Sequence, residues 1–154
     1  MIRQLIESAL IVDPVEAAEK TAALQSMLEF AVGADRLAKR DLGAVQKALL
    51  ERESKGSTGI GNGVAVPHVK GKEVKAMSLV LGRSKAGIQY QAIDGRPVHS
   101  VFMILAPLDQ AESHLQALRW ISTLARNSDF RRFMLQAAGE AQIRDLLVEM
   151  GSPR

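Results

Sequence analysis

A glycine-rich segment that leads directly into a proline-histidine pair is the feature that most restricts how this chain folds. Residues 59–63 carry glycine at every second position, so backbone N–H groups there are free of bulky side chains and can approach an anion. The Val-Ala-Val sequence at 64–66 predicts a short buried strand, because β-branched residues suit a pleated sheet. Pro67 fixes its own φ and donates no hydrogen bond, so we expect it to end that strand. His68 is then expected at the tip of a rigid support beside an anion-binding loop.

The composition indicates a single globular domain without disulfides. A chain of 154 residues is long enough to bury one hydrophobic core, and 47% of its residues are apolar while 24% are charged. We expect one domain over residues 1–154, with its core at about 10–149. The chain has no cysteine, which excludes disulfides and thiolate metal sites and fits a reducing compartment.

The charge pattern argues against nucleic-acid and membrane partners. The net charge is +3, the basic residues are scattered, and one Trp and one Tyr offer no platform for stacking bases. No apolar run approaches the length of a membrane span, and Arg3 and Glu7 interrupt the N-terminus too early for a signal peptide. We therefore expect no nucleic-acid binding, no membrane insertion and a cytoplasmic location.

Alternating strand and helix patterns predict an α/β fold. The sequence Asp-Pro-Val-Glu at 13–16 is typical of a helix start, so a helix should begin there or one turn later. Residues 76–81 predict a strand, 82–87 a turn and 88–90 another short strand. The apolar run at 98–106 predicts a central strand that is covered on both faces.

The clearest amphipathic helix is predicted at residues 111–126. Leu115, Leu118 and Ile121 follow helical spacing, and we expect them to face the core. Two further helices follow it. Strands that are covered by helices predict a layered α/β domain.

Histidine chemistry makes His68 a candidate for carrying a phosphoryl group. Phosphoryl transfer needs an in-line nucleophile and fixed positive or N–H groups around the phosphate oxygens. A neutral imidazole, whose ordinary pKa is about 6.5, is a competent nucleophile, and its phosphorylated nitrogen is a good leaving group. An alkyl phosphate on Ser57 or Thr58 would be too inert for a relay, so these residues are candidates for contacting the phosphate through a hydroxyl or a backbone N–H. From the residues alone, His68 is equally interpreted as an ordinary exposed loop histidine.

Two more residues are candidates for holding the phosphate. Arg52 continues the apolar stripe of Val45 and Leu49 and so points toward the core or a cleft; alternatively it is a last-turn cation that favours the helix C-terminus. His114 lies in the first turn of the helix at 111–126, where free N–H groups favour a phosphoryl group. It is also interpreted as a capping-region histidine at the edge of the core.

The sequence from 56 to 68, GSTGIGNGVAVPH, resembles the active-site signature of enzyme IIA of the bacterial sugar phosphotransferase system, in its fructose/mannitol/nitrogen-regulatory class. The resemblance includes Glu51-Arg52-Glu53 just upstream, continues through 93–107 and 114–134, and covers about residues 20–147. It implies a central mixed β-sheet flanked by helices on both sides, in an α/β/α layered domain. It also implies that His68 is phosphorylated, that Arg52 holds phosphate oxygens and that His114 donates a hydrogen bond to the phosphate or to His68. Val69 departs from the family pattern, in which a small residue follows the histidine, and this predicts narrowed access to His68 or a regulatory offshoot.

The resemblance also implies the partners. We expect an HPr-like phosphocarrier protein as donor, and an enzyme IIB or a regulatory target protein as recipient. The absence of cysteine argues against a fused enzyme IIB domain, which in this family uses a cysteine. No metal or nucleotide cofactor is expected. Two alternatives stay open: a regulatory module whose partners read the phosphorylation of His68, and a module that binds partners without being phosphorylated.

Other interpretations of these residues are weaker. The three histidines lack the short spacing of a zinc site, and His99 is expected to be a hydrogen-bonded structural residue at a sheet end. The glycines at 59, 61 and 63 do not form a dinucleotide-binding loop, because a helix is predicted before them and a strand after them, and Val64 replaces the third glycine.

Overall fold

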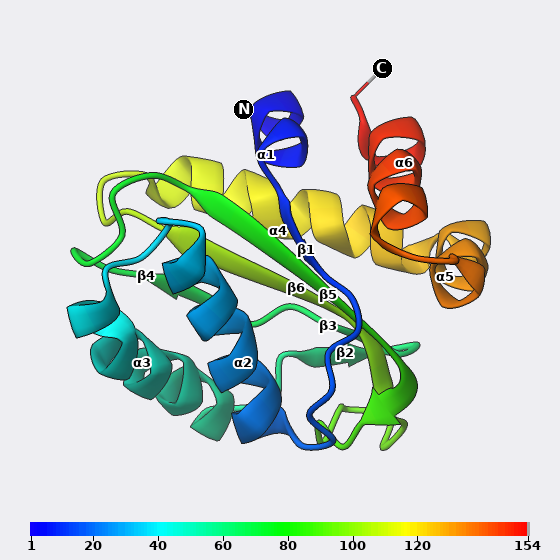
Figure 1. Ribbon diagram of the computed structural model, residues 1–154, viewed down its shortest axis with the longest axis horizontal. Coiled ribbons are helices and arrows are strands. Elements are labelled where there is room, and N and C mark those ends of the chain that lie inside the picture. Colours follow the sequence, from blue (N-terminus) through cyan, green and yellow to red (C-terminus); the bar gives the residue numbers. More distant parts are fainter. Residues whose placement is uncertain (154) are drawn as a thin grey trace.

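The computed structural model describes residues 1–153 and has a six-stranded mixed sheet at its centre (Figure 1). The strands lie across the sheet in the order β1 (Leu10–Val12), β5 (Ser78–Ile88), β6 (Val98–Ala106), β3 (Val64–Ala65) and β2 (Gly59–Gly61), and β4 (His68–Lys70) also pairs with β6. The pairs β1–β5, β3–β6 and β4–β6 are parallel, while β5–β6 and β2–β3 are antiparallel. The predicted mixed sheet is confirmed.

Helices cover both faces of this sheet (Figure 1). On one face lie α1 (Ile2–Glu7), α4 (Ala111–Arg126), α5 (Ser128–Gln136) and α6 (Glu140–Gly151). On the other lie α2 (Lys20–Gly33) and α3 (Leu42–Ser54), the latter preceded by a 3-10 turn, Lys39–Asp41. The predicted layered α/β fold is therefore confirmed. Within residues 1–153, no helix has the length and hydropathy needed to cross a bilayer.

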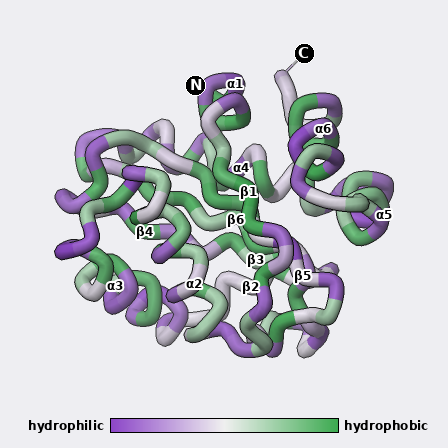
Figure 2. Tube along the Cα trace, viewed as in Figure 1, coloured by the Kyte–Doolittle hydropathy of each residue, from purple (hydrophilic) through white to green (hydrophobic). Residues whose placement is uncertain are grey.

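Strand β6 is the apolar centre of the molecule. Every residue of β6 except His99 is buried, and Figure 2 shows the central strands as the most hydrophobic part of the chain. Phe102 and Ile104 belong to the core beneath α4, whereas Val101 and Met103 belong to the core beneath α2 and α3. Because successive side chains of a strand alternate between faces, a strand covered on both faces must be apolar throughout. The structure confirms the strand predicted at 98–106.

The strand that was predicted to end at Pro67 does end before it, at Ala65, but a second strand, β4, begins directly after it at His68. Val64 pairs with Ser100 and His68 with Ile104, both in parallel with β6. The offset between partners is 36 residues in each case (100 − 64 and 104 − 68), so the register is unchanged across the interruption. Pro67 lacks an N–H, yet its carbonyl accepts a hydrogen bond from Ile104 N at 3.0 Å. His68 is therefore the first residue of a paired strand and not the tip of a loop.

Strand β5 is longer than the sequence predicted, and the turn at 82–87 does not form. Gly82 and Arg83 pair with Val101 and Ser100 of β6, and only the stretch after Arg83 is irregular. A Cβ at Gly82 would lie 2.6 Å from Cγ2 of Val15. This glycine therefore marks a place where the chain before α2 crosses close to the sheet, not a turn.

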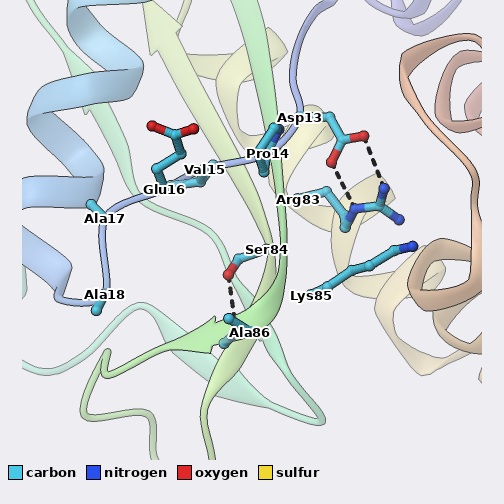
Figure 3. A pocket seen from close by; sticks show the side chains of 11 residues that line it. Asp13, Pro14, Val15, Glu16, Ala17, Ala18, Arg83, Ser84, Lys85 and Ala86 are labelled. Carbon is cyan, nitrogen blue, oxygen red and sulfur yellow. Dashed lines mark hydrogen bonds and ion pairs between the residues drawn. The ribbon is translucent and has the colours of Figure 1, made fainter.

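Of the two helix starts predicted, at 13–16 or one turn later, the structure has the later one, because α2 begins at Lys20. Asp13 forms a tertiary ion pair instead: its two carboxylate oxygens accept hydrogen bonds from Nε and Nη2 of Arg83 at 2.8 and 2.9 Å (Figure 3). The remaining guanidinium donor, Nη1, bonds to the carbonyl of Met134 at 2.7 Å. Arg83 is 3% exposed, and its pair with Asp13 borders a cavity of about 490 Å³. The acid thus joins β1 to β5 and α5 rather than capping a helix.

The buried pair between Asp13 and Arg83 generates a stability prediction. We expect Asp13→Asn to lower the free energy of unfolding by about 3 kcal/mol, because it leaves the buried guanidinium without its counter-charge. Urea denaturation measures this change. The matched control is Asp129→Asn, which removes an exposed pair with Arg132 and should cost less than about 1 kcal/mol. Equal losses in the two variants would contradict the prediction.

Candidate active site

A β-hairpin places the glycine-rich segment at the edge of the sheet, beside β3. Gly59–Gly61 forms β2, which pairs with β3 across a turn at Asn62 and Gly63. Both turn residues have positive φ values, 57° and 77°, as a two-residue type I′ hairpin requires. This stretch was predicted to be an anion-binding loop. The Asn-Gly pair flanked by apolar residues was the signal that would have identified the hairpin.

The hydrogen bond of His68 to the backbone defines which ring nitrogen is available for chemistry. Nδ1 of His68 lies 2.7 Å from the carbonyl oxygen of Val66. A carbonyl only accepts hydrogen bonds, so Nδ1 carries the proton and Nε2 keeps its lone pair. The side chain is partly buried. This hydrogen bond thus fixes the orientation of the His68 imidazole at the surface of the sheet.

His114 of α4 packs against His68. The two ring centroids are 5.3 Å apart and the rings meet edge to face, at 63°. His114 is 9% exposed, and its Nε2 is buried without a hydrogen-bond partner among residues 1–153. Burial, and then the nearby charges of His68 and Lys70, lower the pKa of His114. A buried polar atom without a partner is costly, which indicates that this nitrogen meets a group that is added to the site.

Arg52 and Ser57 share a cavity with His68. This cavity of about 180 Å³ is bounded by the end of α3, the β2–β3 hairpin and Leu118 and Ser122 of α4. Arg52 lies in the last turn of α3, and its Nη1 donates to the carbonyl of Gly56 at 2.8 Å. The hydroxyl oxygen of Ser57 accepts the N–H of Gly59 at 3.0 Å. Four predicted site residues, Arg52, Ser57, Thr58 and His68, therefore line one cavity, and His114 packs on the ring of His68.

Thr58 forms hydrogen bonds inside the protein. Both of its hydrogen-bond donors are directed at Glu53: the backbone N–H bonds to Oε1 at 3.1 Å and the hydroxyl bonds to Oε2. Thr58 is 3% exposed. Both donors of Thr58 are therefore engaged by Glu53, although Thr58 also lines the cavity at His68. The sequence did not predict a role for Glu53, because it lies outside the helical stripe of Val45, Leu49 and Arg52.

Val69 points away from His68. It pairs with Leu105, and its side chain packs on the core beneath α2 and α3, whereas His68 faces α4. Adjacent residues of a strand project to opposite faces. Val69 therefore does not narrow the approach to the His68 ring.

Apolar side chains surround the entrance to the site. Leu115 and Leu118 were predicted to face the core, but Leu115 is 48% exposed because His114, Ala117 and Ile121 occupy the inner face of α4. Ile60 of the hairpin is also exposed. Exposed apolar groups beside a polar centre are typical of a protein-docking surface.

The third histidine lies apart from this site. Nδ1 of His99, near the opposite end of β6, bonds to the carbonyl of Ser84 at 2.8 Å. This hydrogen bond confirms the predicted structural interpretation of His99. Across residues 1–153, no three His, Asp or Glu side chains are grouped closely enough to hold a metal ion.

Comparison with known proteins identifies relatives of this chain. Residues 4–150 match the family described as phosphoenolpyruvate-dependent sugar phosphotransferase system, EIIA 2. The fructose-specific EIIABC component of Bacillus subtilis is 38% identical over 146 residues, which are 95% of this chain but 23% of that protein. The fructose-specific EIIA component of Haloferax volcanii is 38% identical over 86% of this chain and 85% of its own length. A nitrogen regulatory protein of Bradyrhizobium diazoefficiens is 36% identical over 77% and 76%, respectively.

Solved structures share the fold. The nitrogen regulatory protein IIA-Ntr of Neisseria meningitidis has a TM-score of 0.76 at 26% identity, covering 91% of this chain and 93% of its own. The mannitol enzyme IIA of Escherichia coli, determined in complex with phosphorylated enzyme IIB, has a TM-score of 0.74 at 18% identity, covering 90% and 93%.

The placement of Val69 generates a test of access to the site. We expect Val69→Ala to leave modification of His68 unchanged and to lower the free energy of unfolding by about 1 kcal/mol, because it removes only core contacts on the opposite face. Labelling of His68 by diethyl pyrocarbonate, followed by mass spectrometry, measures access. Faster labelling in the variant would contradict the orientation of Val69.

The lowered pKa of His114 generates a pH-dependence prediction. Below about pH 6.5, this histidine takes up a proton in the unfolded chain but stays unprotonated in the folded chain. The free energy of unfolding therefore decreases as the pH is lowered from the unfolded pKa to the folded pKa. Above that window the group contributes no pH dependence. We expect His114→Asn to weaken the loss of stability between about pH 7.5 and pH 5, measured by urea unfolding. Parallel curves for variant and wild type would show that His114 has an ordinary pKa.

Proposed function

Because this chain belongs to the EIIA 2 family of the phosphoenolpyruvate-dependent sugar phosphotransferase system, we propose that it is a phosphocarrier that accepts a phosphoryl group on Nε2 of His68. The donor is an HPr-like protein carrying phosphohistidine. The P–N bond of the donor breaks as the bond to Nε2 of His68 forms, and the donor imidazole leaves. The proton on Nδ1 of His68 stays on its hydrogen bond to Val66.

The observation that carries this proposal is the convergence of His68, His114 and Arg52. A neutral imidazole with a free lone pair faces a cavity that also receives a guanidinium. Arginine suits phosphate oxygens because its planar group donates two parallel hydrogen bonds. Nε2 of His114, which is buried without a partner among residues 1–153, donates a hydrogen bond to the phosphoryl group. This contact gives the buried nitrogen a hydrogen-bond partner. Ser57 supplies a hydroxyl at the same cavity.

The recipient of the phosphoryl group is an enzyme IIB. A mannitol enzyme IIA with this fold was determined in complex with phosphorylated enzyme IIB, which supports such pairing. Leu115 and Ile60 are exposed apolar residues. The donor protein and the recipient protein bind to this apolar surface one after the other.

A regulatory role is the second candidate. Its support is the similarity to nitrogen regulatory proteins, at 36% identity over 77% of this chain for the Bradyrhizobium diazoefficiens protein. In that role the same phosphorylation of His68 changes which target protein binds the apolar surface. Phosphorylation of His68 is common to both candidates, so it is the step to test first.

Phosphorylation is tested by incubating the chain with phosphoenolpyruvate, enzyme I and HPr. We expect an acid-labile phosphate on the wild type and none on His68→Ala, because Nε2 of His68 is the nucleophile. The control His99→Gln, at the other end of β6, should be modified as the wild type is. An unmodified wild type, while a known acceptor in the same mixture is modified, would overturn the proposal and favour a partner-binding module that is not phosphorylated.

The role of His114 is tested by the rate of transfer. We expect His114→Ala to fold and to accept phosphate roughly 100-fold more slowly, since it loses one donor to the developing charge on the phosphoryl oxygens. Rapid-quench measurements of a single turnover give the rate constant, and circular dichroism gives the folded state. An unchanged rate constant would remove His114 from the mechanism.

A further inference from the structure

A buried hydrogen-bond network lies directly behind the candidate active site. Its centre is the carboxylate of Glu53, which is 5% exposed and forms an ion pair with Nζ of Lys20 at 3.1 Å. The same carboxylate accepts the backbone N–H and the hydroxyl of Thr58. The hydroxyl of Thr58 in turn lies 2.9 Å from that of Tyr90. The network thus joins the first residue of α2, the last turn of α3 and the segment leading into β2.

The direction of these hydrogen bonds follows from the groups involved. The carboxylate of Glu53 only accepts, so Thr58 must use its single hydroxyl proton there. Tyr90 is then the donor to the Thr58 hydroxyl oxygen. Burial raises the pKa of Tyr90 above its usual range, so the phenol keeps the proton it donates. Every polar atom at the centre of the network therefore has a partner of the correct kind.

Lys20 makes a buried carboxylate tolerable at this place. Its ammonium group is 14% exposed and lies 4.8 Å from the centroid of the Tyr90 ring, in addition to its ion pair. A buried carboxylate without a counter-charge takes up a proton or destabilises the fold. Lys20 therefore supplies the counter-charge that the buried carboxylate of Glu53 requires.

The network determines where residues 56–58, in the segment between α3 and β2, lie. Arg52 and Glu53 are neighbours in the last turn of α3, yet Arg52 bonds to Gly56 and lines the His68 cavity while Glu53 turns inward to Thr58. Ser57 is held between these two anchored residues. Displacing Thr58 therefore displaces Ser57 and, through Gly56, the guanidinium of Arg52.

We propose that Glu53, ion-paired with Lys20 and hydrogen-bonded to Thr58, is a positioning residue that holds Ser57 and Arg52 in register with His68. This inference rests on the proposed phosphocarrier function. Glu53 itself touches neither phosphate nor partner protein. Because small misplacements of positioning groups slow transfer strongly, its loss should lower the rate constant of transfer and leave the affinity for the donor unchanged.

The test compares single-turnover phosphorylation of the wild type and of Glu53→Gln by phosphorylated HPr, over a range of donor concentrations. We expect a rate constant at saturation that is about 10- to 100-fold lower in the variant, with an apparent KM within about twofold of the wild type. The matched control is Glu51→Gln, an exposed glutamate two residues earlier on the same helix, which should transfer as the wild type does.

Thr58 and Lys20 provide tests that do not depend on the folding of Glu53→Gln. Thr58→Val should slow transfer about as much as Glu53→Gln, whereas Thr58→Ser, which keeps the hydroxyl, should stay within about twofold of the wild type. The double variant Lys20→Met/Glu53→Gln should lower the rate constant of transfer by less than the product of the two single-variant factors, since the two groups act as a pair. Circular dichroism melts identify variants that fail to fold.

The outcomes separate this inference from the proposed function. A wild type that is not phosphorylated overturns the proposed function and this inference with it. A phosphorylated wild type with unchanged rate constants in Glu53→Gln and Thr58→Val overturns the positioning role alone. A raised KM at an unchanged rate constant also overturns it, because that result places Glu53 in donor binding.

Discussion

The parallel pairing of the His68 strand with β6 is the interaction on which the site depends. The register of β3 continues into β4 across Val66 and Pro67, so residues 64, 66 and 68 share the face beneath α4. Val64 and Val66 are packed into the core of that face, and His68 follows at its edge. A shift of one residue would turn His68 toward the core beneath α2 and α3 and bring Val69 to the active site. Burial of two valines therefore determines the direction of the nucleophile.

The site combines two histidine rings, in contact with each other, with the guanidinium of Arg52, which lines the same cavity as His68. His68 is fixed in one tautomer by a backbone carbonyl, and His114 is kept neutral by burial, which lowers its pKa. Arg52 provides the permanent positive charge. The one carboxylate close to this site, Glu53, is turned inward and neutralised by Lys20. Its negative charge therefore does not repel a phosphoryl group at His68.

The two faces of the sheet carry different parts of the site. The face beneath α4 carries the paired histidines, and the face beneath α2 and α3 carries the network that holds the segment entering β2. Arg52 and Glu53 stand where these two regions meet, at the end of α3. Far from both, Asp13 and Arg83 join β1 to β5 and α5. The cavity beside that pair is larger than the one at His68, so size alone does not identify the site.

The sequence by itself determined the family, the layered fold and the central strand at 98–106, and it selected His68, His114, Arg52 and Ser57, which the structure brings together. These features follow from local patterns: an apolar run, helical spacing, and a motif whose residues lie close together in the chain. Only the tertiary structure decided that β4 continues the register of β3 beyond Pro67, that Asp13 pairs with Arg83, and that both donors of Thr58 bond to Glu53. In each of these cases the partner lies in another element, or the outcome depends on strand register. The sequence around a hydrogen-bond donor does not predict which acceptor it will bond to, because that depends on which elements the fold brings together.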